Sequence, residues 1–422
     1  MGPQKERMDC FVAIAPLRKR FAFVAGNDVG ATADELIPPA PINPSERIDA
    51  IDVLRGVALF GVMAMNVTTI FRISIFEQFL FPKAPTSPLD HTVETVLKLA
   101  IDLKAFALFS LLFGVGLAIQ FERLSKSPRR TALLVRRLAV LLAFGLIHLC
   151  LIWNGDILTE YALAGLIVLP FLFGPRWLLA VAALASLGLY LAMQAFPPPG
   201  LWPGAAAMAQ DVTQAHRIYA TGGFLDVLAF RLREIPLLAS LHAYIFPRTI
   251  GLFLLGAFAW RTGILRNSPH HLLLLIAAAC ISLGAALILS HAGGFTAGSG
   301  RIGALAEPLG TILLALGYGA AIIGIASLRS GQRLLGWAAP LGRMAFTNYL
   351  AQSIIFGWVF YGYGLGLFGR LGAATALAIG IAVYVAQVSF SKWWLRRFRY
   401  GPVEWLWRTL MYGEAQPMRL TA

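Results

Sequence analysis

Apolar residues in this chain occur in long runs that are separated by short polar segments. A helix of about 20 apolar residues is needed to cross the hydrocarbon core of a bilayer. Runs that meet this length lie near residues 51–71, 97–120, 133–153, 157–174, 177–196, 243–261, 271–291, 306–326, 342–363 and 372–392. The pattern predicts an all-α, polytopic membrane protein with about ten transmembrane helices.

The polar segments divide the chain into three parts. Residues 1–48 contain no long apolar segment and are predicted to be a mobile cytoplasmic extension. Residues 49–395 form the predicted helical bundle, with an extracytoplasmic excursion near 197–240 where charged and apolar residues mix. Residues 396–422 combine arginine with tryptophan and tyrosine, a pattern typical of an amphipathic segment in the membrane interface.

Charge and composition set the orientation and the expected partners. Only 13% of the residues are charged, whereas soluble domains have about 25%. Most lysine and arginine residues lie in the N-terminal tail and after every second run, so the positive-inside rule predicts that both termini are cytoplasmic. No basic face remains for nucleic acid, and the 3 cysteines are too widely spaced for a metal site. The lipid bilayer is therefore the expected partner, and a homodimer remains an open alternative.

Polar residues in the first run form a stripe along one helical face. Such groups are costly at membrane depth unless they are paired or face water, so they mark candidate sites. Asp52 and Arg55 are one turn apart at the cytoplasmic end and can pair. Asn66 follows on nearly the same face, about 16 Å along the helix. In the alternative interpretation, Arg55 anchors the helix at the surface and Asn66 makes a hydrogen bond between helices.

A second polar group surrounds a predicted hairpin turn at residues 154–155, on the extracytoplasmic side. Asp156 can cap the following helix, and Glu160 lies on the same face one turn later. His148 precedes the turn, and an imidazole near carboxylates that orient it is a candidate general base. Alternatively, Asp156 is only a cap and His148 only a donor between helices.

A third group is dispersed over the other runs. Arg343 lies at the cytoplasmic end of the ninth run near the level of Arg55, so both could bind one phosphate group. Asn348 and Gln352 share a face of the same helix and, with Asp52, complete the predicted cofactor-binding region. Further candidates on the substrate side are Lys104, Arg248 and His91. Each of these residues could equally serve as an interfacial anchor or a packing contact.

Several motifs in this order resemble those of the YeiB-like family of bacterial membrane proteins, whose C-terminal part is labelled domain of unknown function 418. The motifs are Asp52-Val53-Leu54-Arg55-Gly56 with Asn66, Phe109-Ser110-Leu111-Leu112-Phe113-Gly114, His148 with Gly155-Asp156-Ile157-Leu158, Arg343-Met344-Ala345-Phe346-Thr347-Asn348-Tyr349, and Gly401-Pro402-Val403-Glu404-Trp405. The resemblance covers nearly everything after about residue 48.

The first helix of that family is similar to that of heparan-alpha-glucosaminide N-acetyltransferase and, more distantly, to transmembrane acyltransferases that decorate bacterial polysaccharides. The polysaccharide branch carries a histidine where this chain has Asn66, so that catalytic histidine cannot be carried over. The resemblance implies transfer of an acyl group, with acetyl the first choice, from cytoplasmic acyl-CoA as co-substrate to an extracytoplasmic acceptor such as a sugar or envelope glycan.

In this interpretation Arg55 and Arg343 bind the phosphates of CoA and His148 removes the proton of the acceptor. Asp156 or Glu160 orients the imidazole, and the amide of Asn66 donates to the oxyanion. A covalent acyl-histidine route is also compatible with these residues, and no metal is required. The alternatives from other classes are a small-solute transporter or exporter lined by the same groups and a non-catalytic membrane scaffold.

Overall fold

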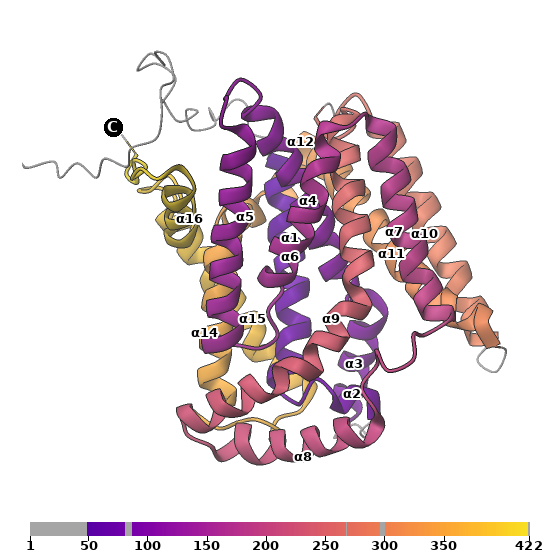
Figure 1. Cartoon of the computed structure of the whole chain (residues 1–422), viewed down its shortest axis with the longest axis vertical. Coiled ribbons are helices and arrows are strands. Elements are labelled where there is room, and N and C mark those ends of the chain that lie inside the picture. The colour runs from indigo at the N-terminus through magenta and orange to yellow at the C-terminus, as the bar shows by residue number, and fades with distance from the viewer. Residues whose placement is uncertain (1–48, 81–86, 267, 296–299, 421–422) are drawn as a thin grey trace, which may run out of the picture. The chain divides into compact units, whose positions relative to one another are not determined.

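The computed structural model describes residues 49–80, 87–266, 268–295 and 300–420, and the predicted N-terminal extension 1–48 lies outside these ranges. Every secondary-structure element among the described residues is a helix, apart from one isolated β-bridge between Phe398 and Arg419. Long helices run side by side in a bundle, as Figure 1 shows. The all-α prediction is therefore confirmed.

The helices follow the chain in a regular order. The first half contains α1 (Asp49–Met65), η3 (Asn66–Phe71), α2 (Glu77–Leu80), α3 (Pro88–Ala100), α4 (Lys104–Arg123), α5 (Arg130–Ile147), η4 (His148–Ile152), α6 (Leu158–Val168), η5 (Leu169–Phe173) and α7 (Arg176–Ala195). The second half contains α8 (Ala205–Thr221), α9 (Phe224–Arg261), α10 (Leu272–Phe295), α11 (Gly300–Ala326), α12 (Arg329–Leu335), η6 (Gly336–Ala338), α13 (Ala339–Arg343), α14 (Ala345–Phe360), α15 (Ala373–Trp394) and α16 (Pro402–Tyr412).

Seven helical stretches of the described chain are long and apolar enough to cross a membrane. They are Asp49–Phe71, Arg130–Ile152, Arg176–Ala195, Phe224–Arg261, Leu272–Leu289, Ala304–Ala326 and Ala373–Trp394. Each of them contains most or all of one predicted apolar run, and the shorter apolar stretch Leu158–Phe173 matches another. The chain is thus a polytopic membrane protein, and the total of about ten spans stays a prediction.

The second predicted run is divided in the structure. α3 ends at Ala100 and α4 begins at Lys104, and between them Leu103 has a left-handed φ of 56°. The Nζ of Lys104 donates to the carbonyl oxygen of Lys98 at 2.8 Å, which satisfies an otherwise unpaired acceptor at the end of α3. Asp102 and Lys104 therefore lie at a helix junction, whereas the sequence predicted one continuous helix through both.

Two helices cover the region of the predicted excursion near 197–240, α8 and the first part of α9. α8 is the amphipathic helix expected there, and it lies across one end of the bundle in Figure 1. α9 begins at Phe224 and continues for 38 residues through Pro236 and Pro247. A proline inside a helix removes a backbone hydrogen bond and bends the helix, and Figure 1 shows α9 turning from beside α8 into the bundle.

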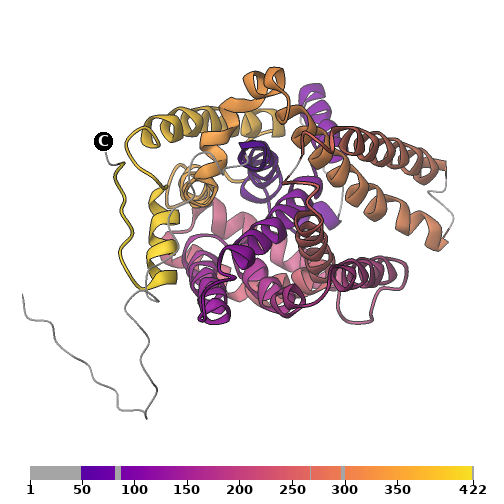
Figure 2. The same cartoon turned by 90° about the horizontal axis from the view of Figure 1, so that it is seen from above.

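α1 occupies the middle of the bundle and packs against α4, α11, α13, α14 and α15 (Figure 2). Two glycines allow α13 and the turn before it to approach α1 closely. A Cβ added at Gly56 would lie 2.2 Å from the Ala338 carbonyl oxygen, and one at Gly342 would lie 1.9 Å from the Asp52 carbonyl oxygen. This close approach brings the start of α1 beside the residue after Gly342, which is Arg343.

Candidate functional site

A cavity of about 770 Å³ lies among α1, α4, α5, α6, α14 and α16. Basic residues of α1, α4, α5, α13, the turn after α9 and the C-terminal segment line it, and they are Arg55, Arg123, Arg137, Arg266, Arg343, Arg399 and Arg408. Asp52, Gln120, Glu122 and Glu404 also line it, and most of the other lining residues are apolar or aromatic, among them Leu59, Val62, Phe109, Leu112, Phe113, Leu158, Tyr161 and Tyr349. The cavity therefore leads from an arginine-rich mouth into an apolar interior.

The mouth contains the two arginines that the sequence placed at one level. Arg55 pairs with Asp52 at 2.8 Å, as predicted, and its Nη1 also donates to the carbonyl oxygen of Gly342 at 3.4 Å. Arg55 and Arg343 both line the cavity. The structure thus brings together the residues that were expected to bind an anionic group.

α16 closes one side of the mouth through Glu404. Its Oε1 accepts hydrogen bonds from the backbone N–H groups of Phe346 at 2.8 Å and Thr347 at 3.0 Å, so a carboxylate from α16 caps the first turn of α14. Burial raises the pKa of the Glu404 carboxyl, and the hydrogen bonds from Thr347 and Phe346 act in the opposite direction. Glu404 belongs to a quoted motif but was not predicted as a capping residue.

His148 lies at the apolar end, on the π-helical turn η4 that ends α5. Its Nδ1 is 2.8 Å from Oδ1 of Asp156, and its Nε2 is 2.9 Å from Oγ of Ser353 on α14. Asp156 also accepts from the backbone N–H groups of Leu158 at 3.1 Å and Thr159 at 2.7 Å. Asp156 therefore both caps α6 and holds the imidazole, which unites the two roles that the sequence left as alternatives.

Tyr349 separates this group from the cavity. The Tyr349 and His148 ring centroids are 5.1 Å apart, and the Tyr349 hydroxyl donates to the carbonyl oxygen of Gly155 at 3.4 Å. Tyr349 and Leu158 line the cavity, whereas His148 is 0% exposed and Ser353 is 2% exposed. The cavity thus ends one side-chain layer from the imidazole.

Ser353 is the functional candidate that sequence reasoning missed. Its hydroxyl lies one turn after Tyr349 in a segment that was singled out for Asn348 and Gln352. A serine in a membrane helix commonly donates to the carbonyl four residues earlier, so its presence in an apolar run carries little information. The signal that could have revealed it is the one-turn spacing from Tyr349 of the matched motif.

Glu160 lies near a different histidine. It accepts from Nδ1 of His242 at 2.7 Å and from the hydroxyl of Thr249, both on α9. Arg248 beside them is 3% exposed, and its guanidinium lies 5.6 Å from the ring centre of Tyr190. Of the two carboxylates proposed to orient His148, the structure brings Asp156 to it and places Glu160 in this second cluster.

Two further predicted residues face the neighbouring helix α15. Asn348 donates to the hydroxyl of Ser391 at 3.0 Å, and Gln352 donates to the side-chain carbonyl of Gln387 at 2.8 Å. These contacts match the packing alternative for Asn348 and Gln352. Asn66 is 4% exposed at the start of η3, and its side-chain carbonyl oxygen has no hydrogen-bond partner within the described part of the chain.

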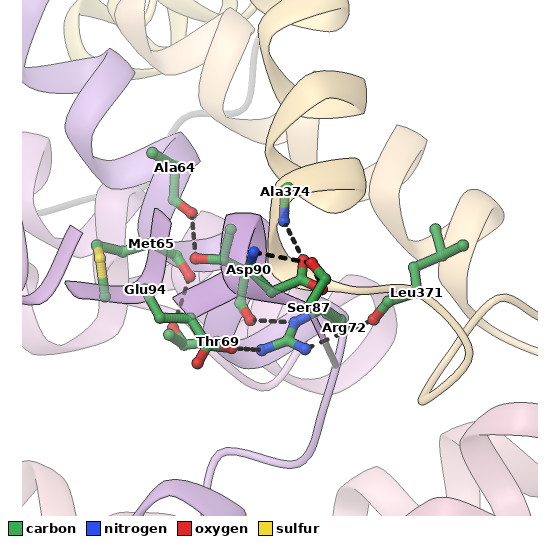
Figure 3. Close-up of polar contacts among 10 residues, drawn as sticks. Ala64, Met65, Thr69, Arg72, Ser87, Asp90, Glu94, Leu371 and Ala374 are labelled. Carbon is green, nitrogen blue, oxygen red and sulfur yellow. Dashed lines mark hydrogen bonds and ion pairs between the residues drawn. The ribbon is translucent and has the colours of Figure 1, made fainter. Parts of the chain in front are cut away.

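The other end of η3 is fastened by an arginine whose donors are used inside the protein (Figure 3). Arg72 donates from Nε to the carbonyl oxygen of Thr68 at 2.8 Å, from Nη2 to Glu94 at 2.8 Å and from Nη1 to the carbonyl oxygen of Leu371 at 3.5 Å. The reserve candidate His91 lies exposed on α3, the helix that carries Glu94. Arg72 therefore joins η3, α3 and the segment before α15.

Comparison with known proteins identifies relatives that match most of this chain. A family model described as "Protein of unknown function (DUF418)" matches residues 259–414. Uncharacterized protein YxaH of Bacillus subtilis (strain 168) is 35% identical over 402 residues, which cover 90% of this chain and 97% of the relative. Uncharacterized protein YeiB of Escherichia coli (strain K12) is 30% identical over 399 residues, covering 88% and 98%. Because homology extends over most of its length, the chain belongs to the DUF418 family of YeiB and YxaH.

Proposed function

We propose that this protein is a membrane-embedded acyltransferase that moves an acyl group, with acetyl the first choice, from cytoplasmic acyl-CoA to an acceptor on the opposite side of the membrane. The observation that carries the proposal is the cavity of about 770 Å³, which is lined by arginines at one end and by Tyr349, the ring next to His148, at the other. Its volume lies within the range of small-molecule sites, about 300–1,000 Å³.

The two ends of the cavity suit the two ends of an acyl-CoA molecule. Guanidinium groups bind phosphates through paired hydrogen bonds, and Arg55 and Arg343 stand at the mouth with other arginines. The apolar section between Leu59 and Tyr349 suits the less polar arm that carries the thioester. An acyl-CoA bound in this way would present its reactive carbonyl on the side of His148.

The buried pair supplies acid–base chemistry. Asp156 fixes the ring orientation through Nδ1, and Nε2, which lies 2.9 Å from the Ser353 hydroxyl, is the nitrogen that can accept a proton. We propose that the amide of Asn66, on the helix that continues from Arg55, donates to the oxyanion. No step of this transfer needs a metal ion, and an acceptor such as a sugar or envelope glycan fits the chemistry.

The proposed topology has about ten spans, with both termini in the cytoplasm of a bacterial cell and the mouth of the cavity on the same side. The arrangement in Figure 1 supports it, because α12 and α16 lie toward the end of the bundle opposite α8. Reporter fusions at the C-terminus and in the α8 region measure the orientation. A periplasmic C-terminus would contradict the topology and the cytoplasmic supply of acyl-CoA.

The test is binding and turnover of acetyl-CoA by the detergent-purified protein, measured as release of free CoA with a mixed pool of sugar acceptors. Wild type is compared with Arg55→Ala and His148→Ala, and with Arg129→Gln, which removes an exposed arginine from the α4–α5 connection. We expect weaker binding in the first variant, lost turnover in the second and no change in the third. A folded wild-type protein that neither binds nor consumes acyl-CoA would refute the proposal.

The second candidate function is a small-solute transporter. It is favoured by polar residues that meet at α9, a helix that contains two prolines: His242 of α9 pairs with Glu160 of α6, and Arg248 of α9 is 3% exposed. Interrupted helices with buried charges commonly form the sites of transporters. Substrate flux into vesicles without consumption of acyl-CoA, abolished in Glu160→Gln, would favour this function over acyl transfer.

A further inference from the structure

We infer that Ser353 is a nucleophile that carries the acyl group between the two substrates as an acyl-serine ester. The inference rests on the proposed acyl transfer and goes beyond it, because direct transfer needs only a base. It starts from the two contacts of one imidazole, with Asp156 at 2.8 Å from Nδ1 and Ser353 at 2.9 Å from Nε2.

The hydrogen bonds fix the direction of proton transfer. The carboxylate of Asp156 already accepts from the backbone N–H groups of Leu158 and Thr159, so it acts as an acceptor toward His148 as well. Nδ1 of the ring therefore carries the proton. In a neutral imidazole the other nitrogen is then an acceptor, so the Ser353 hydroxyl donates to Nε2. This is the order of partners in a Ser-His-Asp triad, which is defined by geometry and not by fold.

A purely structural role is the alternative for Ser353, in which its hydroxyl donates to the preceding turn of its own helix. That contact exists, from Oγ to the carbonyl oxygen of Tyr349 at 3.3 Å. It is longer than the 2.9 Å contact with His148, and hydroxyl hydrogen bonds are most favourable at about 2.7–2.8 Å. The contact with His148 is the shorter of the two and provides a base for the hydroxyl proton.

α14 places this hydroxyl toward the cavity and not toward the lipid. Tyr349 and Ser353 are one turn apart and share a face. Tyr349 lines the cavity, whereas Asn348 and Gln352 on the adjoining face are bound to α15. The nucleophile is thus separated from the cavity by the Tyr349 side chain, and movement of that ring would expose it to a thioester.

The reaction balances with the two substrates already proposed. Ser353 Oγ bonds to the acyl carbon, the carbon–sulfur bond of the thioester breaks, and the serine proton passes through Nε2 of His148 to the sulfur of CoA. An acceptor hydroxyl then attacks the serine ester, gives its proton to His148 and leaves as the acyl ester. His148 returns that proton to Ser353 Oγ, which regenerates the enzyme.

A covalent relay suits a site that receives its substrates from opposite faces of a membrane. Direct transfer requires acyl-CoA and acceptor to be bound at once on the two sides of a completely buried imidazole. A serine ester lets CoA leave before the acceptor arrives, so the site never has to be open to both faces. The two half-reactions are then separate in time, which gives ping-pong kinetics.

The experiment uses the purified full chain with acetyl-CoA that carries a labelled acetyl group, first without any acceptor. We expect covalent label on the wild-type protein, located by mass spectrometry at Ser353, together with release of CoA. In Ser353→Ala the label disappears and CoA release falls by about 10³-fold or more. In Ser353→Cys the label becomes a thioester, which neutral hydroxylamine removes, whereas the serine ester resists it.

Ser391→Ala is the matched control, because it removes another buried hydroxyl that hydrogen-bonds with α14. It should retain label and turnover, and acetyl-CoA binding confirms that each variant is folded. Wild-type turnover in a Ser353→Ala protein that binds acetyl-CoA, or label on His148 in place of Ser353, would overturn the relay while acyl transfer stands. Absence of any acetyl-CoA binding or consumption by the wild type would overturn both.

Discussion

Two histidines of this bundle are paired with buried carboxylates, and the pairs have almost the same geometry. His148 lies 2.8 Å from Asp156, and both side chains are 0% exposed. His242 lies 2.7 Å from Glu160, with side-chain exposures of 29% and 6%. A pair of this kind at membrane depth marks a candidate site, yet the two pairs differ in everything around them.

The difference lies in the second partner of each pair. The free nitrogen of His148 meets a serine hydroxyl, and its neighbour Tyr349 lines the cavity. Both carboxylates have further donors, but in the second pair the hydroxyl, that of Thr249, bonds to the carboxylate Glu160 and not to the histidine. A histidine–carboxylate pair alone therefore does not identify chemistry; a reactive hydroxyl and an access route do.

The largest difference in kcat should appear when each of the two histidines is replaced by alanine in a separate variant. We expect His148→Ala to lower kcat for acetyl transfer by about 10⁴-fold, because a positioned general base contributes up to about that factor. His242→Ala should change kcat by less than about tenfold, since it lies outside the proposed transfer route. Rates of CoA release under saturating acetyl-CoA measure both. Equal losses in the two variants would remove the distinction between the pairs.

The carboxylates should show the same contrast more weakly. Asp156→Asn keeps an oxygen that can cap α6 but no longer holds the correct ring tautomer, so we expect a loss of about 10³-fold in kcat with little change in thermal stability. Glu160→Gln should leave kcat within about tenfold. Both variants are compared by CoA release and by thermal unfolding in detergent. Loss of activity only in Glu160→Gln would move the site to the second pair.

The apolar helices could be predicted from the sequence because a helix that crosses a membrane needs a run of about 20 apolar residues, which is visible in the chain. Each of the seven candidate spans corresponds to a predicted run. The sequence did not predict the break before Lys104, because the left-handed Leu103 is not a glycine and lies within an apolar run, which gives no sign of a helix end. Nor did it predict the length of α9, because the first half of this helix mixes charged and apolar residues and gives no continuous apolar run.

Part of the candidate site was visible in sequence for the same reason. Asp52 and Arg55 are one helical turn apart, so helix geometry sufficed to pair them. His148 and Asp156 lie on either side of a predicted hairpin turn, so their closeness along the chain indicated the contact. Ser353 is 205 residues from His148, and only packing of α14 against η4 brings them together. Glu160 is near Asp156 in sequence but turns toward α9. Contacts between distant segments are what one sequence cannot supply.

A smaller effect should separate the mouth of the cavity from its inner end. We expect Arg55→Gln to raise KM for acetyl-CoA by about tenfold and to leave kcat nearly unchanged, because one charged hydrogen bond to a phosphate contributes about 1.5–3 kcal/mol to binding alone. High salt should reduce the difference from wild type. Arg129→Gln is the exposed control. A fall in kcat at constant KM would place Arg55 in the chemistry instead of in binding.

The smallest effect should come from removing the hydroxyl of Tyr349, the residue that lies between the cavity and the His148–Asp156 pair. The Tyr349 hydroxyl donates to the Gly155 carbonyl over 3.4 Å, a long contact that contributes little. Tyr349→Phe keeps the ring that separates the cavity from His148, so kcat and KM should stay within about threefold. Steady-state kinetics decide this. A large loss of kcat in Tyr349→Phe would mean that the phenol takes part in proton transfer. The His148–Asp156 pair would then differ from the His242–Glu160 pair by two reactive hydroxyl groups, those of Tyr349 and Ser353, and not by Ser353 alone.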